Sequence, residues 1–181
     1  MSLCGIDEAG RGCIAGDMVI AGVILKKKIA GLTDSKKIST KKRELLYPQI
    51  VDSALYHIVS FSPQKIDEIG LSACLKEGLL EITSTLSAKH YLFDGNTNFG
   101  LAHIEHQIKA DQDVAEVSAA SILAKVTKDR SLCQAGAAFS QFSFCAHQGY
   151  GTKKHIEEIR AHGYTSLHRR SYKIKALHDL T

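Results

Sequence analysis

Short apolar runs alternate along the chain with longer segments whose apolar residues recur at helical spacing. Residues 3–7 and 18–25 are too apolar to be solvated on either face, so we expect two strands that are covered on both sides. Residues 54–61 alternate between apolar and polar positions and predict a third strand. Two further strands are predicted over residues 91–93 and 103–108.

Helices are expected between these strands. The first begins at residues 39–40, where a hydroxyl can cap it, and is expected to end near Leu46 because Pro48 follows. A second begins at Ser62 and keeps helical spacing as far as Leu86. The other predicted helices span residues 114–129 and 153–161. With no repeat, low-complexity segment or linker, this order predicts one α/β domain over residues 1–181.

Composition narrows the class of protein. The 181 residues are 44% hydrophobic, which suits a folded core, and no apolar run reaches the ~20 residues of a membrane span. The first residues lack the basic segment of a signal peptide, so we expect a cytoplasmic protein with no membrane contact. A net charge of +4 is compatible with a polyanionic partner but does not require one.

The cysteines predict reduced thiols. They are odd in number, widely spaced and contain no C-x-x-C pair, which argues against a disulfide framework or a zinc site. The five positions are Cys4, Cys13, Cys74, Cys133 and Cys145.

Candidate chemistry begins where the first predicted strand ends, in the sequence Gly-Ile-Asp-Glu-Ala-Gly-Arg-Gly. Asp7 and Glu8 are adjacent carboxylates that can share a site if the strand ends or twists there. Gly10 and Gly12 permit such a turn and let the backbone approach a ligand closely. Arg11 offers planar donors suited to phosphate. The stretch therefore indicates a divalent cation held beside a phosphodiester.

Further acids stand at the ends of other elements. Asp94 closes a predicted strand and is followed by glycine, which places it where α/β proteins bind ligands or, alternatively, in an ordinary turn. Asp111 or Asp113 precedes the helix over 114–129, and either could instead simply cap that helix or complement its dipole. Oxygen ligands without histidine or cysteine favour Mg²⁺ or Mn²⁺ over Zn²⁺.

Basic side chains could supply the other contacts to a phosphate. A polar loop carries Ser35, Lys36 and Lys37, and the C-terminal stretch carries Arg169 and Arg170 among tyrosines. The alternative for both is a solvated basic surface. Taken with the acids, they favour hydrolysis of a nucleic-acid phosphodiester by two metal ions.

The chain resembles the ribonuclease HII family, the type 2 ribonucleases H. The matching motifs occur in the family's order and extend over nearly the whole chain. They are Gly-Ile-Asp-Glu-Ala-Gly-Arg-Gly at 5–12, Asp-Ser-Lys-Lys at 34–37, Asp-Gly-Asn at 94–96, Lys-Ala-Asp at 109–111, Ser-Ala-Ala-Ser-Ile-Leu-Ala-Lys-Val at 118–126, Gly-Tyr-Gly-Thr at 149–152 and His-Arg-Arg-Ser-Tyr at 168–172.

The resemblance implies a ribonuclease H-like fold, a mixed central sheet flanked by helices with its first three strands antiparallel, and a C-terminal helical part that binds substrate. By motif match, the catalytic and metal-binding acids are Asp7, Glu8, Asp94 and Asp111, which favours Asp111 over Asp113. The cofactor is Mg²⁺ or Mn²⁺.

The resemblance also assigns nucleic-acid contacts. It implies that the backbone of Gly10, Arg11 and Gly12 reads the 2′-hydroxyl and phosphate of a ribonucleotide. It implies that Tyr150 packs against the deoxyribose beyond the RNA–DNA junction. Two phosphate clamps are expected at Ser35 and Lys36.

The implied activity is hydrolysis of the RNA strand of RNA–DNA hybrids and cutting on the 5′ side of ribonucleotides embedded in duplex DNA. The expected ends are 3′-hydroxyl and 5′-phosphate, and the expected roles are ribonucleotide excision and primer removal during DNA replication, by a monomer. Cys13 and Asp17 replace prolines that the family often carries, so we expect a more mobile loop and an added negative charge near the site. The rival hypotheses are a junction resolvase of the same fold and a non-catalytic RNA- or DNA-binding module.

Overall fold

The protein is built on a mixed five-stranded sheet. The computed structural model describes residues 2–32 and 38–180, and its strand order is β3-β2-β1-β4-β5. β1 pairs antiparallel with β2, and β2 antiparallel with β3, whereas β4 runs parallel to β1 and to β5. The expected antiparallel arrangement of the first three strands is confirmed. The strands are β1 (Leu3–Ala9), β2 (Met18–Leu25), β3 (Ala54–Phe61), β4 (His90–Asp94) and β5 (Glu105–Gln107).

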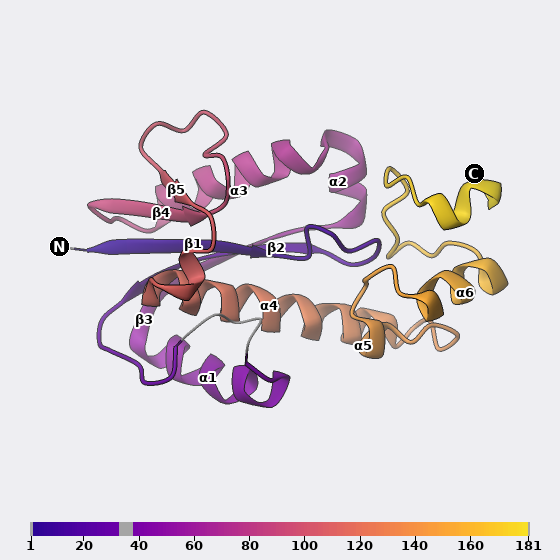
Figure 1. Cartoon of the computed structure of the whole chain (residues 1–181), viewed down its shortest axis with the longest axis horizontal. Helices are drawn as coiled ribbons and strands as arrows, with labels where there is room; N and C mark the ends of the chain where they lie inside the picture. Colours follow the sequence, from indigo (N-terminus) through magenta and orange to yellow (C-terminus); the bar gives the residue numbers. More distant parts are fainter. Residues whose placement is uncertain (1, 33–37, 181) are drawn as a thin grey trace.

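Helices cover both faces of this sheet (Figure 1). α2 and α3 lie on one face and α1 and α4 on the other, while α5 and α6 lie beyond one end of the sheet, near the C-terminus. No helix of the described residues is long and apolar enough to cross a bilayer. The helices are α1 (Thr40–Ser53), α2 (Pro63–Ile69), α3 (Leu71–Thr85), α4 (Ala115–Gly136), α5 (Phe144–His147) and α6 (Lys153–His162), with the 3-10 turns η1 (Ala110–Gln112) and η2 (Lys175–Leu180).

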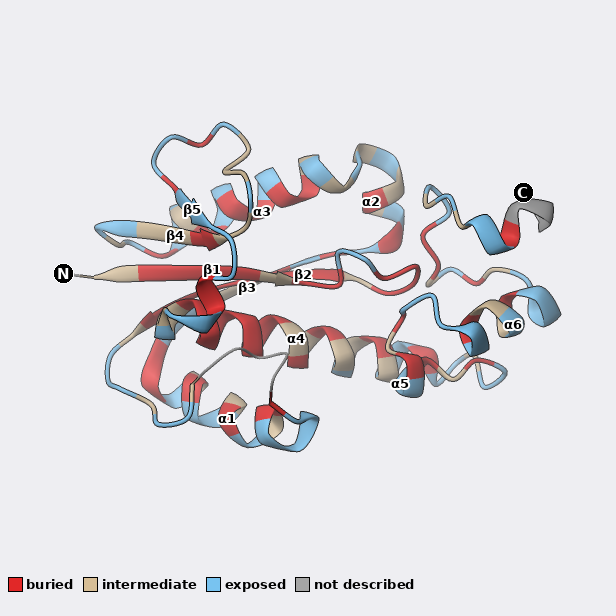
Figure 2. Ribbon diagram, in the orientation of Figure 1, coloured by how far each residue is buried: buried red, intermediate tan, exposed pale blue. Residues whose placement is uncertain are grey.

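β2 is buried on both faces, as its apolar sequence predicts (Figure 2). Met18 and Ile20 belong to the apolar cluster that includes α3 residues, and Val19 and Ala21 belong to the one that includes α4 residues. Alternate side chains of one strand therefore join the two helical layers to the sheet, and the hydrophobic effect stabilises both interfaces.

α4 lies unusually close to β1. A Cβ on Gly5 would stand 2.3 Å from the backbone nitrogen of Val117, so only glycine fits there. Ala119 and Ala120, both fully buried, keep the facing surface of the helix thin. This close contact fixes the position of β1 relative to α4.

Two predicted helices differ from the observed ones. α1 continues through Pro48 to Ser53, because Leu46 and Ile50 are buried on either side of the proline and their packing outweighs the lost hydrogen bond. The segment predicted as one helix from Ser62 is divided into α2 and α3 at Gly70, whose φ of +83° no helix accommodates.

Other boundaries also moved. β5 covers only Glu105–Gln107 of the predicted 103–108, because Ile104 turns into the core just before it. α4 runs to Gly136, seven residues beyond the predicted end at Asp129, and α5 was not predicted because four residues cannot show helical periodicity.

The C-terminal part, residues 139–177, packs around its own apolar cluster, which includes Phe142, Phe144 and Ile159. It joins the loop that follows β1 through a backbone bridge between Ala15 and His168. A C-terminal helical part beside the loop agrees with the expectation from sequence.

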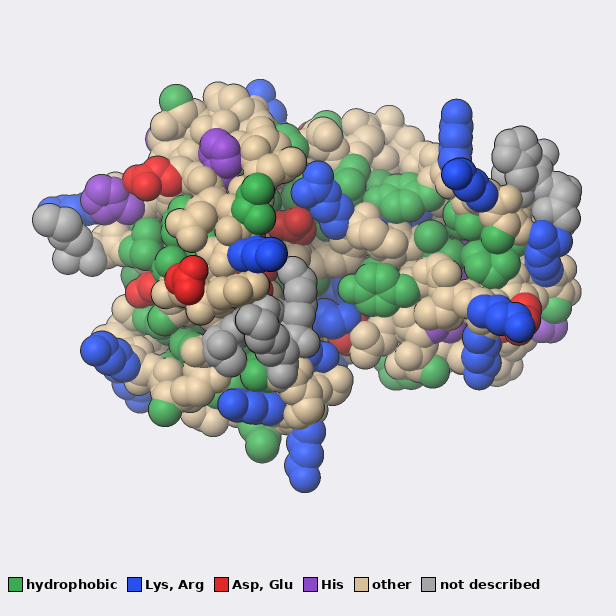
Figure 3. Space-filling view, viewed as in Figure 1, with side chains coloured by type: hydrophobic (Ala, Val, Ile, Leu, Met, Phe, Trp, Pro, Cys, Tyr) green, Lys and Arg blue, Asp and Glu red, His purple; other side chains and the backbone are tan. Residues whose placement is uncertain are grey.

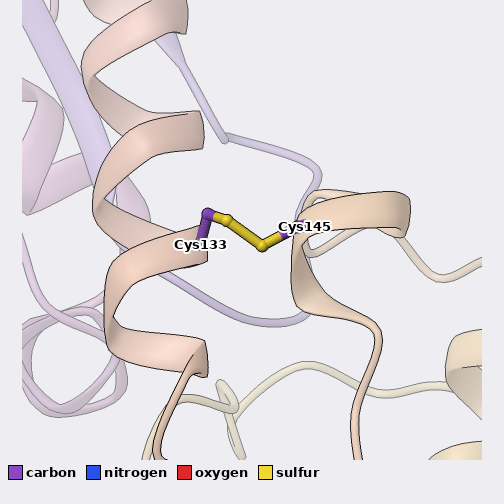
Figure 4. Close-up of a disulfide and its surroundings, with 2 residues drawn as sticks. All are labelled: Cys133 and Cys145. Atoms are coloured by element: carbon purple, nitrogen blue, oxygen red, sulfur yellow. A yellow bond between two sulfur atoms is a disulfide. The ribbon is translucent and has the colours of Figure 1, made fainter. Parts of the chain in front are cut away.

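One pair of cysteines is linked in the structure. Cys133 of α4 and Cys145 of α5 form a disulfide with their Cα atoms 4.6 Å apart (Figure 4). The expectation that all the thiols are reduced is therefore wrong for this pair, because the turn that returns α5 against α4 brings together positions whose sequence spacing gave no sign of it. Cys4, Cys13 and Cys74 are buried free thiols.

Replacing Cys133 with serine should lower the free energy of unfolding by about 2–3 kcal/mol, because a link across 12 residues no longer restricts the unfolded chain. Urea unfolding of wild type and Cys133→Ser, each with and without reductant, measures this. Reductant should weaken the wild type and leave the variant unchanged. Equal midpoints for wild type in both conditions would contradict the link.

Candidate active site

The parallel pairing of β1 with β4 creates the centre of the site. Ile6 pairs with Phe93, so the next residues, Asp7 and Asp94, come side by side. Asp94 ends β4, and Asp7 lies two residues before the end of β1. The carboxyl ends of parallel strands are where α/β sheets place ligands. Two acids 87 positions apart in the sequence are thereby brought together.

A third acid is delivered by the turn before α4. The Asp94 carboxylate accepts hydrogen bonds from the backbone amides of Lys109 at 2.8 Å and Asp111 at 3.4 Å. Lys109 has a left-handed backbone with φ of +62°, which is uncommon for a residue other than glycine and is found at functional sites. This bend aims Asp111 at the two strand ends.

Asp7, Asp94 and Asp111 form a cluster in which one carboxylate oxygen from each lies within 4.8 Å of the others. Asp7 and Asp111 are only 6% and 2% exposed. Burying three carboxylates together is costly unless a cation offsets their charge. An all-oxygen set of this size fits Mg²⁺ or Mn²⁺, and these three residues would hold it.

The electrostatics of Asp7 reflect this crowding. Burial, foremost, and then the carboxylates of Glu8 and Asp94 raise the pKa of Asp7 well above its ordinary value. Hydrogen bonds from Ser121 and from the Glu8 amide, which donates at 2.7 Å, oppose the rise without cancelling it. The site is therefore unfavourable for three negative charges when no cation is bound.

Glu8 lies beside this cluster and not within it. Its carboxylate stands 3.8 Å from the Arg11 guanidinium, and the side chain is 11% exposed. Its charge still contributes to the raised pKa of Asp7. Of the four expected acids, the structure brings three within ligating distance of one another and places Glu8 next to them.

The alternative that Asp111 or Asp113 caps α4 is wrong. The N-cap is Val114, and no side-chain hydrogen bond caps this helix in the described structure. Asp111 belongs to the three-acid cluster, whereas Asp113 is exposed and lies outside it.

The two glycines of the Gly-Arg-Gly turn differ. Gly10 has φ of +92°, and a Cβ there would meet the carbonyl oxygen of Asp17 at 2.7 Å, so the fold itself requires glycine. A Cβ on Gly12 would meet nothing within 4 Å among the described residues. No contact among the described residues therefore requires glycine at position 12.

A pocket of about 380 Å³ opens beside the acids. Residues 8–12 form one wall, and Arg43, Lys125 and Tyr150 contribute to the others. On the face shown in Figure 3, acidic side chains near the middle are flanked by Lys and Arg. Sequence reasoning missed Arg43 and Lys125 as lining residues, because a basic residue within a helix shows no sign of the direction in which it points.

Tyr150 borders the pocket with its ring close to two ammonium groups of α4. Lys125 Nζ is 5.2 Å and Lys128 Nζ 4.9 Å from the ring centroid. The residue remains 41% exposed. An exposed aromatic face beside cations suits a nucleic-acid backbone.

Arg169 does not serve as a phosphate contact. The side chain is fully buried, and Nε and Nη2 donate to the Gly16 carbonyl at 3.0 and 2.9 Å. Nη1 donates to the Arg11 carbonyl at 3.4 Å. The sequence-based assignment of this arginine to phosphate is wrong, since its donors are engaged in holding the loop. Arg170 is exposed.

Cys13 and Asp17, which stand where the family often has proline, each make a hydrogen bond. The Cys13 thiol donates to the Gln148 carbonyl at 3.5 Å, and Asp17 accepts from the Ser131 hydroxyl at 3.5 Å. Burial raises the pKa of Asp17. The expected clamps Ser35 and Lys36, and Lys37 beside them, lie outside the described residues.

Solved ribonucleases H share this architecture. The chain matches the structure of the PCNA:RNase HII complex from Archaeoglobus fulgidus with a TM-score of 0.82 and 29% identity, covering 96% of each chain. It matches ribonuclease H2 from Pyrococcus horikoshii in fold, with a TM-score of 0.77 at 24% identity over 96% of this chain and 94% of that one. The fold is α/β and ribonuclease H-like, and with its acidic centre it defines a divalent-metal-dependent nuclease.

Sequence comparison gives the family. The family model of ribonuclease HII matches residues 4–175. A ribonuclease HII from Sulfurovum sp. is 51% identical over 179 residues, 99% of this chain and 95% of that protein, and one from Aliarcobacter butzleri is 51% identical over 178 residues, 97% and 93%. The chain belongs to the ribonuclease HII family and is an endoribonuclease acting on RNA–DNA, as the resemblance implied.

Asp7→Asn should stabilise the metal-free protein, because it removes one of three crowded charges and keeps an oxygen acceptor. In the presence of EDTA at pH 8 the thermal midpoint should rise, by about 2–4 °C for each kcal/mol of repulsion relieved. The folded-state pKa of Asp7 lies above the ordinary 3.8, so the folded wild type takes up a proton first as pH falls, and the variant's advantage should shrink on acidification.

Differential scanning calorimetry from pH 8 downward measures the thermal midpoints of wild type and Asp7→Asn. Asp113→Asn is the control, because Asp113 lies outside the cluster. Added Mg²⁺ should stabilise wild type more than Asp7→Asn. Equal Mg²⁺-induced shifts in the two proteins would contradict the assignment of Asp7 as a metal ligand.

Proposed function

We propose that the chain cuts on the 5′ side of ribonucleotides, both in RNA–DNA hybrids and where single ribonucleotides are embedded in duplex DNA. The products carry 3′-hydroxyl and 5′-phosphate ends. The observation that carries the proposal is the convergence of Asp7, Asp94 and Asp111 within 4.8 Å, next to the pocket that begins at the Gly-Arg-Gly turn.

In this proposal Asp7, Asp94 and Asp111 hold Mg²⁺ or Mn²⁺, and Glu8 completes the set of catalytic acids. The chemistry that the cations supply when bound is polarisation of the phosphate and activation of water for in-line attack. The Asp94 carboxylate is oriented for this by the amides of Lys109 and Asp111, so its position does not depend on the cation. The Arg11 side chain is 47% exposed, so its guanidinium can leave Glu8 and bind a substrate phosphate.

Recognition of the ribonucleotide falls to the backbone of Gly10, Arg11 and Gly12. The absence of neighbours around Gly12 in the described structure supports a backbone that a sugar or phosphate can touch directly. The 2′-hydroxyl is the group that distinguishes the two sugars at this position. Tyr150 packs against the deoxyribose on the other side of the junction, while Ser35, Lys36 and Arg170 contact phosphates.

We also propose that residues 1–181 act as one domain and as a monomer in the cytoplasm, in ribonucleotide excision and in primer removal during replication. The contacts of Arg169 with the loop after β1 support the first point, because they join the C-terminal part to the catalytic sheet.

A duplex that carries one ribonucleotide tests the function directly. With Mg²⁺ the wild type should cut it once, on the 5′ side, and without metal it should not cut. Asp94→Asn should reduce the rate on the order of a thousandfold, because a metal-ligating charge is lost, while circular dichroism should show that the protein remains folded. Comparable cutting of an all-DNA duplex would favour a resolvase, and wild-type rates in Asp94→Asn would favour a binding module.

Gly12→Ala should separate substrate contact from folding. Because the fold leaves room for a Cβ at position 12, unfolding should be unchanged. Cutting at a single ribonucleotide should fall roughly 10- to 100-fold, the effect of losing one or two hydrogen bonds to a charged group. Gly10→Ala is the matched control and should destabilise the protein, because its Cβ meets backbone. Full activity in Gly12→Ala would rule out the backbone contact.

A further inference from the structure

The position of Tyr150 depends on the backbone around it. Gln148 and Gly149 both have left-handed backbone, with φ of +52° and +82°, so the tyrosine segment, residues 148–150, belongs to no helix or strand. Its amides bond back to α5, from Gln148 to the Phe144 carbonyl at 2.9 Å and from Tyr150 to the His147 carbonyl at 3.0 Å, and its carbonyl oxygens join it to the rest of the protein.

Each carbonyl of the tyrosine segment is held from a different element. Lys128 Nζ of α4 donates to the Gln148 carbonyl at 2.8 Å, and the Ile14 amide donates to that of Gly149 at 2.8 Å. The Tyr150 carbonyl is 2.9 Å from His155 Nδ1 of α6 and also accepts from the Thr152 amide at 2.8 Å. The side-chain donor to the Tyr150 carbonyl is therefore His155.

The hydrogen bonds of this histidine determine its tautomer. A carbonyl oxygen can only accept, so His155 must carry its proton on Nδ1, which leaves Nε2 as an acceptor in the neutral ring. His155 Nε2 lies 3.1 Å from His168 Nε2, which must then be the donor. His168 Nδ1 is left as the acceptor for the Thr165 amide at 2.9 Å. Each atom in this sequence of bonds has one consistent role.

We call the hydrogen bonds that link Thr165, His168, His155 and the Tyr150 carbonyl the relay. The relay requires both histidine rings to be neutral, and the surroundings of the rings favour the neutral form. Burial, foremost, lowers the pKa of His155 and of His168 to about 4. His147 of α5 stacks on His155 with ring centroids 3.7 Å apart and bonds through Nε2 to Glu158, 3.1 Å away.

The charged groups that act on these rings have opposite effects. Glu158 favours protonation of His155, and Arg170 disfavours protonation of His168. His147 itself disfavours protonation of both, and Lys154 disfavours protonation of His147. Near neutral pH the combined effect of these groups and of burial leaves both His155 and His168 uncharged.

We infer that His155 and His168 are positioning residues that hold the Tyr150 main chain, and thereby determine how strongly the enzyme prefers an RNA–DNA junction. This inference rests on the proposed function, because it acts through the contact of Tyr150 with the substrate sugar. Neither histidine borders the pocket beside the acids, and His155 contacts the tyrosine segment at the Tyr150 carbonyl. His168 also pairs with Ala15 through its backbone, and a side-chain substitution at position 155 leaves that bridge in place.

The first test needs no substrate. Long-range ¹H–¹⁵N correlation spectra of histidine-labelled protein at pH 7 should show His155 as the Nδ1–H tautomer and His168 as the Nε2–H tautomer. The variants His155→Asn and His168→Gln assign the two signals. A charged ring, or an Nε2–H tautomer for His155, would overturn the relay.

The second test measures preference. Let the preference ratio be kcat/KM at a single ribonucleotide in DNA divided by kcat/KM within a long RNA tract. His155→Ala should lower this ratio roughly two- to tenfold, which is the effect expected from the loss of one hydrogen bond. Tyr150→Ala should lower the ratio by the same factor. The double variant should fall no further, because both changes act on one contact.

Two further variants control for general damage. His155→Asn places an amide donor near the Nδ1 position and should retain most of the preference ratio. Leu177→Ala loosens the same apolar cluster from η2 and removes no ring contact of either histidine, so it should lower the thermal midpoint and leave the ratio unchanged.

The outcomes separate the two levels of the hypothesis. Wild type that fails to cut at ribonucleotides refutes the proposed function, while the spectra still decide the relay. A ratio lowered by Tyr150→Ala but not by His155→Ala refutes positioning by the histidines. A ratio that neither variant lowers, or additive losses in the double variant, refutes action through Tyr150.

Discussion

The parallel pairing of β1 with β4 is the constraint on which the rest of the site depends. It places Asp7 beside Asp94 although their charges repel, and the fold maintains that contact through the register of Ile6 with Phe93. The energy for this comes from the apolar layers on both sides of the sheet, since neighbouring strand residues are buried in them. A bound cation would offset this repulsion, so the metal-free protein already has its three carboxylates in place for metal binding.

The second requirement is a loop held rigidly without being covered. The buried Arg169 side chain donates hydrogen bonds to the carbonyls of Gly16 and Arg11, and the Ile14 amide donates to the Gly149 carbonyl. These contacts engage the back of the loop, which leaves the backbone at Gly12 open. Preorganised backbone donors cost no rearrangement when substrate binds.

Much of the fold could be predicted from local pattern, because β2 and β3 show the periodicity of buried and half-buried strands. The path of α1 through Pro48 could not, since tertiary packing decided it. The pattern placed Asp7, Asp94 and Asp111 at the ends of elements but left the choice between Asp111 and Asp113 open, and only the family resemblance closed it. Arg169 was misassigned because a sequence shows charge and not burial, and the Cys133–Cys145 link depends on a turn with no signature.

The nearness of α4 to β1 at Gly5 has a consequence for the whole substrate path. Ser121 bonds Asp7, and Lys125 and Lys128 both lie against the Tyr150 ring, so one helix reaches from the acids to Tyr150. Seven residues separate the first of these positions from the last, a rise of about 10 Å along the axis. The helix thus sets the distance between the acidic cluster and Tyr150. A single inserted residue would turn the far end by about 100° and misalign the two.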